Sequence, residues 1–170
     1  MRVRLATEGD VQAVVQIVQQ VIPLMQGAGN YQWDDCYPTE EHFLNDVQNS
    51  HLWVVADTNG AVIGFAALTT AQPEEYALSG CDISKPSIVP HRMAVDPSAR
   101  RGGAARLLFA KCDELARDMG YNFVRVDTNT CNAAMQRLIL TSGFTQKGEI
   151  SLLGKAGSLR YFCYEKDIIP

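Results

Sequence analysis

One short segment near the middle of the chain combines small residues with clustered positive charge. It reads Arg100-Arg101-Gly102-Gly103-Ala104-Ala105-Arg106. Glycine and alanine let a backbone come close to a bound anion, and arginine adds charge and hydrogen-bond donors. A helix that begins inside the segment would add unpaired N–H groups and a partial positive charge. The pattern therefore predicts a phosphate-binding loop.

The elements on either side support this interpretation. Residues 87–95 have the composition of a strand, and residues 104–119 have apolar side chains at helical spacing. A plain packing turn would not explain three arginines at a helix start, where the helix dipole disfavours cations. A dinucleotide-binding Rossmann site is excluded, because the G-x-G-x-x-G pattern is absent and the loop lies mid-chain, after a hairpin.

The rest of the chain alternates between short strands and helices. The clearest signal is a hairpin, in which residues 51–56 and 61–68 flank the turn pair Asn59-Gly60. Residues 70–86 read as a long connection with room for a brief strand. The other expected elements are a strand at 3–6, a helix that begins at residue 11 and ends near Pro23 or soon after it, helices at 38–47 and 132–142, and strands at 121–127, 144–152 and 159–165. We expect a single α/β (α+β) domain over residues 1–170, with one mixed, mostly antiparallel sheet of six to seven strands and helices on both faces.

Three segments, in order, resemble motifs of the GNAT superfamily of acyl-CoA-dependent N-acetyltransferases. Residues 100–105 resemble its Q/R-x-x-G-x-G/A loop, and residues 93–97 resemble the strand end before that loop. Residues 132–144 resemble its N-x-x-A-x-x-L-Y-x-x-x-G-F helix. The resemblance covers nearly the whole chain. Residues 30–34 and 162–166 further resemble a bacterial branch of the superfamily that has no settled substrate.

The resemblance implies acetyl-CoA as co-substrate and no metal. The loop backbone would bind the pyrophosphate, the backbone of Met93 and Val95 would bind the pantetheine arm and polarise the thioester oxygen, and Asn132 would bind the pantetheine or a water. The implied cofactor-binding residues are Met93, Ala94, Val95, Arg100, Arg101, Gly102, Gly103, Ala104, Ala105 and Asn132.

Acetyl transfer to an amine needs a base for the amine and a proton for the departing thiolate. His91 is the candidate catalytic base, because it lies four residues before Val95 and should point to the same face of the strand. Weaker alternatives are Glu149, Asp34 and Asp35. The family's usual tyrosine acid is replaced by Ile139, so the proton must come from another tyrosine or a water, or the thiolate leaves unprotonated. The alternative tyrosines are Tyr31, Tyr121, Tyr161 and Tyr164.

The segment after the first helix is the expected acceptor site. Its candidate substrate-binding residues are Asn30, Tyr31, Gln32 and Trp33, which are followed by two aspartates. Aromatic faces with nearby carboxylates suit a cationic amine, although a surface loop anchored by Trp33 explains the same residues. The resemblance thus implies acetyl transfer to a primary amine of a small molecule or peptide. The alternative is a non-catalytic acyl-CoA-binding sensor or regulatory module.

Composition limits the other functions. With 15 basic and 19 acidic residues the formal charge is −4, which disfavours binding to a nucleic-acid backbone. The five cysteines lack metal-ligand spacing, and no apolar run reaches the length of a signal peptide or membrane span. We expect a cytoplasmic protein with no nucleic-acid or membrane partner. An open sheet edge near the C-terminal strands could support a homodimer.

Overall fold

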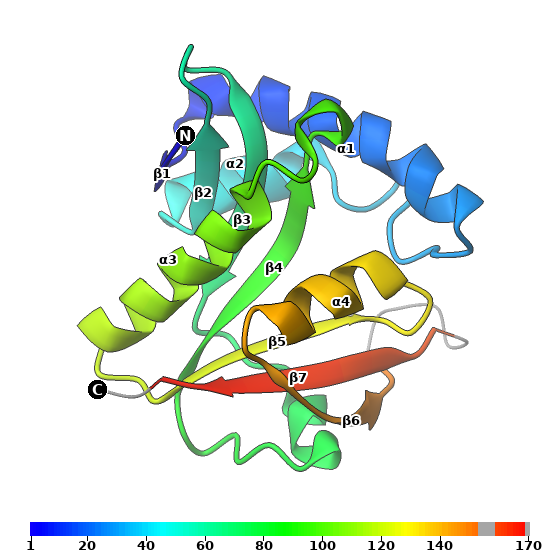
Figure 1. Cartoon of the computed structure of the whole chain (residues 1–170), viewed down its shortest axis with the longest axis vertical. Helices are drawn as coiled ribbons and strands as arrows, with labels where there is room; N and C mark the ends of the chain where they lie inside the picture. Colours follow the sequence, from blue (N-terminus) through cyan, green and yellow to red (C-terminus); the bar gives the residue numbers. More distant parts are fainter. Residues whose placement is uncertain (153–158, 169–170) are drawn as a thin grey trace.

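The computed structural model describes residues 1–152 and 159–168, which build one seven-stranded sheet with helices on both faces (Figure 1). The strand order is β1-β2-β3-β4-β5-β7-β6. The strands are β1 (Arg2–Leu5), β2 (Leu52–Ala56), β3 (Val62–Thr69), β4 (Ser87–Val95), β5 (Phe123–Asn129), β6 (Thr145–Ile150) and β7 (Tyr161–Asp167). The helices are α1 (Val11–Gly27), α2 (Glu40–Gln48), α3 (Ala104–Asp118) and α4 (Ala133–Thr141). This confirms the predicted fold class.

Two helices cover each face of the sheet. On one face, α1 and α2 pack on the sheet through a buried cluster that includes Val14, Phe43 and Phe65. On the other, α3 and α4 pack through a cluster that includes Leu108 and Ile139. The helical spacing of the apolar residues in each helix produces these buried stripes.

The sheet divides where β4 meets β5. These strands run parallel, and their pairing covers only Ser87 with Phe123 and Ile88 with Val124. All other neighbouring strands pair antiparallel. Beyond Ile88, the backbone N–H and C=O groups on this edge of β4 are therefore not paired with β5.

A β-bulge interrupts the pairing of β4 with β3. Ala67 lies opposite His91, whereas Phe65 lies opposite Ala94, so β4 has one residue more than β3 over this stretch. Arg92, inside the bulge, has a left-handed φ of 49°. Because an extra residue reverses the alternation of side chains, His91 shares a face with Ala94 and not with Val95. The expectation that His91 points to the same face as Met93 and Val95 is wrong for this reason.

Helix α1 continues one turn beyond Pro23, an exposed position, and ends at Gly27, which agrees with the expectation that it ends near Pro23 or soon after it. The connection before β4 contains a 3-10 helix, η2 (Glu74–Ser79), and no strand. Fully buried Tyr76 holds η2 against the sheet by packing with residues that include Val89 and Cys163.

Candidate active site

The basic loop has the geometry of a strand-to-helix anion site. After β4, Asp96 accepts a hydrogen bond from the Ser98 N–H and starts a short 3-10 turn. Gly103 then has φ 92° and directly precedes α3, and a Cβ added to it would meet no atom within 4 Å. Left-handed φ favours glycine, and the first N–H groups of the helix that follows have no partner within the helix. The backbone conformation therefore leaves room for an anion beside Gly103.

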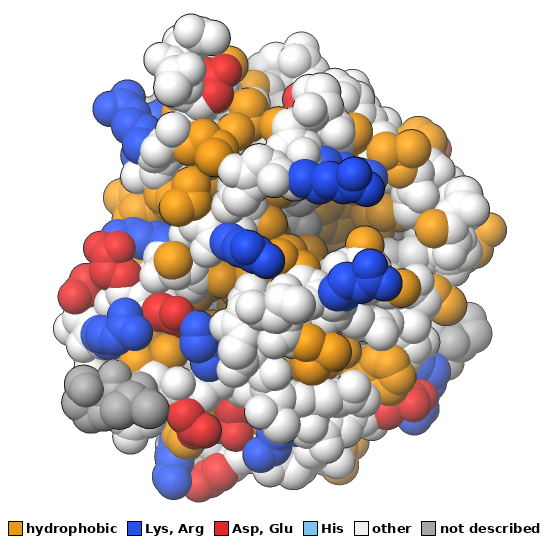
Figure 2. All heavy atoms as spheres, in the orientation of Figure 1, with side chains coloured by type: hydrophobic (Ala, Val, Ile, Leu, Met, Phe, Trp, Pro, Cys, Tyr) orange, Lys and Arg blue, Asp and Glu red, His pale blue; other side chains and the backbone are white. Residues whose placement is uncertain are grey.

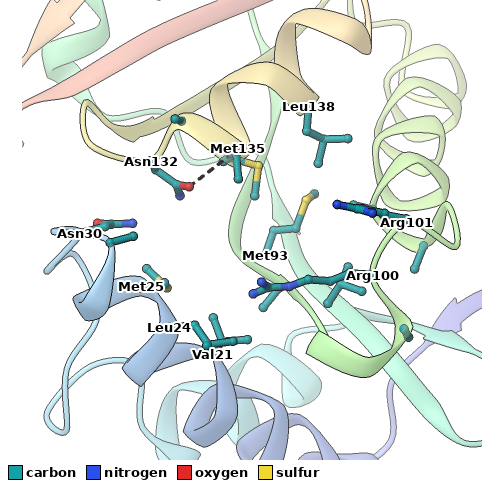
Figure 3. Close-up of a pocket in the computed structure, with 18 of the residues that line it drawn as sticks. Val21, Leu24, Met25, Asn30, Met93, Arg100, Arg101, Asn132, Met135 and Leu138 are labelled. Atoms are coloured by element: carbon teal, nitrogen blue, oxygen red, sulfur yellow. Dashed lines mark hydrogen bonds between the residues drawn. The ribbon is translucent and has the colours of Figure 1, made fainter.

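A cleft of about 790 Å³ opens beside this loop. Figure 2 shows it as a hollow with an apolar floor ringed by basic side chains. In Figure 3, Arg100 and Arg101 face Asn30 and Asn132 across Met93 and Met135. Of the implied cofactor residues, the cleft brings together Met93, Ala94, Val95, Arg100, Arg101, Gly103, Ala104, Ala105 and Asn132. Gly102 does not line it, and its N–H donates to the Ala99 carbonyl.

The edge of β4 offers backbone donors and acceptors to this cleft. The Asp96 N–H donates to the Ile63 carbonyl at 2.9 Å, so it points toward β3. Because successive residues of a strand direct their N–H and C=O groups to opposite sides, those of Val95, and by the same alternation Met93, point away from β3. These groups match the polar backbone that the family resemblance assigns to a pantetheine arm.

A second, smaller pocket of about 150 Å³ adjoins the larger cleft. Met25, Met93, Asn132 and Met135 line both, so the two spaces meet at these side chains. The smaller pocket is also lined by His91, Arg92, Asp127, Trp33, Tyr37 and Tyr161. The structure thus places the candidate base in a separate space that adjoins the cleft beside the basic loop.

The surroundings of His91 in this pocket favour its neutral form. Its Nε2 lies 3.4 Å from the Ala71 carbonyl oxygen. A carbonyl can only accept, so Nε2 carries the proton and the lone pair is on Nδ1. Burial lowers the pKa of His91, with the charge of Arg92 acting in the same direction and that of Asp127 opposing both. A neutral histidine near neutral pH can accept a proton.

Asp127 faces the same pocket from β5. Its Oδ2 accepts a hydrogen bond of 2.6 Å from the Tyr76 hydroxyl. Burial, together with the Asp127 charge, raises the pKa of Tyr76 well above its usual value, so the hydroxyl keeps its proton. The carboxylate is therefore oriented by a permanent donor.

The predicted acceptor segment is divided between the two spaces. The Gln32 Oε1 accepts the Asn129 N–H of β5, and the Gln26 amide donates to the Trp33 carbonyl, so the segment spans from α1 to β5. Gln32 and Trp33 line the smaller pocket. Asn30 instead lines the larger cleft, and Tyr31, 60% exposed, lines neither.

The amide of Asn30 has a defined orientation. Its Oδ1 accepts the Gln32 N–H at 3.1 Å, which assigns the oxygen end. Its Nδ2 is buried and has no hydrogen-bond partner within the described residues. In Figure 3 this nitrogen points toward the cleft. A buried donor without a partner is costly, so Nδ2 is available to a ligand carbonyl.

Arg92 lines the smaller pocket and is held in place by buried Asp46, a pair that sequence reasoning missed. The Arg92 guanidinium donates to both Asp46 carboxylate oxygens, at 2.9 and 2.7 Å, and its Nη1 lies 3.3 Å from the Tyr37 hydroxyl. Asp46 and Arg92 are far apart in the chain, and neither belongs to a motif. Only an aspartate among the apolar positions of α2 hinted at a buried partner.

The position of the usual tyrosine acid is closed off from the cleft. Ile139 is fully buried in the cluster between α3, α4 and the sheet, and it lines neither space. Among the alternative tyrosines, Tyr164 is buried in that same cluster and Tyr121 packs at its edge. Tyr161 is the alternative that lines the smaller pocket.

Comparison with known proteins agrees with this geometry. Residues 18–144 match the family described as "Acetyltransferase (GNAT) family". The chain belongs to the GNAT acetyltransferase family. As a member of that family it is an acetyltransferase, and the non-catalytic alternative loses its support.

Individual GNAT relatives are distant in sequence. A protein named IAA acetyltransferase from Azospirillum brasilense is 26% identical over 157 residues, which cover 89% of this chain and 90% of that protein. A GNAT acetyltransferase structure from Streptococcus agalactiae has a TM-score of 0.80 at 20% identity and covers 99% of this chain and 96% of its own. A ribosomal-protein-alanine N-acetyltransferase structure from Brucella melitensis has a TM-score of 0.71 at 22% identity, covering 98% and 99%. The two structures establish a shared fold.

Two other properties bear on the function. Within residues 1–152 and 159–168, no three or more His, Cys, Asp or Glu side chains are grouped so that they could hold a metal ion. No helix in those ranges combines the length and apolar character needed to cross a membrane.

Proposed function

We propose that this GNAT acetyltransferase transfers the acetyl group of acetyl-CoA directly to a primary amine. The observation that carries the proposal is that two adjoining spaces, the larger cleft and the smaller pocket, have linings of different chemistry. The larger has a basic rim and a polar strand edge, whereas the smaller contains a neutral histidine and a carboxylate. Direct transfer needs the two reactants to enter from different sides and meet at one point.

The residues of the larger cleft fit the parts of CoA. The first N–H groups of α3, with Arg100 and Arg101 beside them, suit a pyrophosphate. The outward groups of Met93 and Val95 suit the amides of the pantetheine arm, and Asn30 Nδ2 offers a donor to a carbonyl oxygen near the junction. Bound acetyl-CoA supplies an activated thioester to the reaction.

His91 would act as the base for the acceptor. A primary amine is mostly protonated at neutral pH, and it must lose a proton before its nitrogen can attack a thioester. The Nδ1 lone pair of His91 can take that proton, because burial keeps the ring neutral. Tyr161, Tyr31, Tyr121, Tyr164 and water remain the candidate donors for the departing thiolate, with Tyr161 best supported by its place in the pocket.

A thiol-release assay tests this proposal. The full-length protein is mixed with acetyl-CoA and a panel of primary amines, and free CoA thiol and acetylated product are both quantified. We expect thiol release to depend on the amine and to equal product formation. Tight CoA binding with thiol release at the hydrolysis background for every amine would refute the proposal.

A further inference from the structure

The two asparagines that line the larger cleft differ in how their side chains are bonded. Asn132 caps α4, because its Oδ1 accepts the Met135 N–H at 3.3 Å, and its Nδ2 donates to the Thr128 hydroxyl at 3.1 Å. Asn30 accepts the Gln32 N–H through its Oδ1, but its Nδ2 has no hydrogen-bond partner within the described residues. Asn30 is only 2% exposed, and a buried donor without a partner is costly. A ligand that bonds this Nδ2 therefore supplies a contact that the free protein lacks.

Asn30 lies where the larger cleft borders the smaller pocket. Its backbone N–H donates to the Met25 carbonyl at 3.0 Å, and Met25 is one of the side chains that line both spaces. Gln32, two residues further along, lines the smaller pocket. In Figure 3, Asn30 lies across the cleft from Arg100 and Arg101, with its amide nitrogen toward the cleft. A CoA molecule whose pyrophosphate lies at those arginines would extend its pantetheine arm, which carries the acyl group, toward Asn30.

The chemistry of the acyl end identifies the partner of this nitrogen. An amide N–H needs a hydrogen-bond acceptor, and the carbonyl oxygens of acyl-pantetheine belong to two amides and one thioester. The outward backbone groups of Met93 and Val95 suit the amides, so the thioester oxygen is the acceptor left for Asn30. Met25, beside Asn30, is unbranched and flexible and can move to admit that oxygen.

The thioester oxygen is also the atom on which charge develops. As the amine nitrogen bonds to the carbonyl carbon, the π electron pair of the C=O bond moves onto the oxygen, which becomes negative. The pair returns to the C=O bond as the carbon–sulfur bond breaks and the thiolate leaves. A donor aimed at this oxygen is therefore stronger in the transition state than in the ground state. Because Asn30 Nδ2 is buried, water competes little for it.

We propose that Asn30 Nδ2 is a catalytic hydrogen-bond donor that stabilises the negative charge on the thioester oxygen during acyl transfer. The inference rests on the proposed function, because it names a residue that serves that same transfer. It divides residues 30–33 by role: Asn30 acts on the acyl donor, whereas Gln32 and Trp33 line the smaller pocket. The Gln32 N–H, by donating to Oδ1, holds the amide with Nδ2 free for the ligand.

Two substitutions separate this role from a structural one. Asn30→Asp keeps an Oδ1 that accepts the Gln32 N–H but replaces the donor by an acceptor, whereas Asn30→Ala removes both. Activity is measured at about pH 8, well above the usual pKa of an aspartate. We expect kcat to fall about 100-fold in Asn30→Ala and further in Asn30→Asp, because the carboxylate repels the charge on the oxygen. If Asn30 only held the segment in place, Asn30→Asp would be the more active variant, and that order would overturn the inference.

CoA affinity and a control substitution complete the kinetic test. CoA lacks the thioester, so its calorimetric Kd should change less than about 3-fold in Asn30→Ala. A Kd that weakens as much as kcat falls would assign Nδ2 to a pantetheine amide and overturn the inference. Asn45→Asp makes the same chemical change at an exposed position of α2, and it should leave kcat unchanged.

A second measurement needs no amine. Acetyl-CoA labelled with carbon-13 at the thioester carbonyl is bound to the protein, and its C=O stretching band is recorded by infrared difference spectroscopy. A hydrogen bond weakens the C=O bond, so we expect the band at lower wavenumber than for free acetyl-CoA, with a shift back in Asn30→Ala. The same band position in both proteins would overturn the inference.

The infrared and thiol-release results distinguish the two proposals. If the band shifts but no amine releases thiol, the Asn30 hydrogen bond stands and the proposed transfer fails. If amines are acetylated and the band does not depend on Asn30, the transfer stands and the role of Asn30 is wrong.

Discussion

Gly103 allows a direct test of the anion site, because charge and bulk can be changed separately there. The residue has φ 92°, and the space where a Cβ would lie is empty. Gly103→Asp and Gly103→Asn place side chains of nearly equal size in that space, and both residue types tolerate left-handed backbone better than most. The two variants differ by one negative charge.

The expected difference follows from electrostatics. Two like charges ~6 Å apart repel by about 3 kcal/mol at an effective dielectric of ~20. The cleft is open to solvent and salt, so we expect about 1–2 kcal/mol between the variants. This corresponds to a Kd for CoA about 5- to 30-fold weaker in Gly103→Asp than in Gly103→Asn. Both should bind more weakly than the unmodified protein, because the added side chain fills the space of the anion.

The assay is titration calorimetry with CoA at low ionic strength, repeated at high salt, where the gap between the variants should narrow. Gly60 supplies the control, since it also has a positive φ, 89°, and open space around its Cβ, but lies in the β2–β3 hairpin turn. Gly60→Asp should lower the melting temperature without changing the Kd. Equal CoA affinity in Gly103→Asp and Gly103→Asn would show that no phosphate lies beside this residue.

Other predictions concern the base and the buried contacts. His91→Gln should lower kcat/KM about 100-fold and remove the acidic limb of its pH profile; in the unmodified protein that limb should lie below pH 6.5, since burial lowers the pKa from that value and only the neutral ring accepts a proton. A profile unchanged by the substitution would exclude His91. Asp46→Asn should cost about 3–5 kcal/mol in urea unfolding, because Arg92 keeps its charge in a buried position; a loss below 1 kcal/mol would mean that water solvates Arg92. Ile139→Tyr should lower the free energy of unfolding by about 1–3 kcal/mol, because the larger side chain overpacks a fully buried position. An unchanged midpoint of urea unfolding would show that the core around Ile139 has room for a tyrosine side chain.

Local patterns in the chain were sufficient to predict most of the elements. The Asn59-Gly60 pair marks the β2–β3 hairpin, and the apolar spacing after Asp10 marks α1. Pro23 marked the end of α1 only approximately, because the helix continues past this exposed proline to Gly27. The 3-10 helix at η2 carried no recognisable pattern, since its position is set by the burial of Tyr76 against the sheet.

The local geometry of the basic loop was also predictable, because its residues are consecutive in the chain. A glycine before a helix start, with arginines around it, produces the same local geometry wherever it occurs. The motif spacing that followed it was enough to indicate the acetyltransferase family.

The smaller pocket, which is the proposed acceptor site, depended on tertiary structure. Its groups come from separate elements: Trp33 from the α1–α2 connection, Arg92 from β4, Asp127 from β5 and Tyr161 from β7. Their proximity results from strand pairing between distant segments, and no local pattern encodes it. The β4 bulge is the clearest example, because one extra residue in β4 determines on which face of the sheet the His91 side chain lies. The sequence alone therefore determined most of the elements, the basic loop and the family, whereas the packing of the sheet decided which side chains line the smaller pocket, because that depends on the register of strands far apart in the chain.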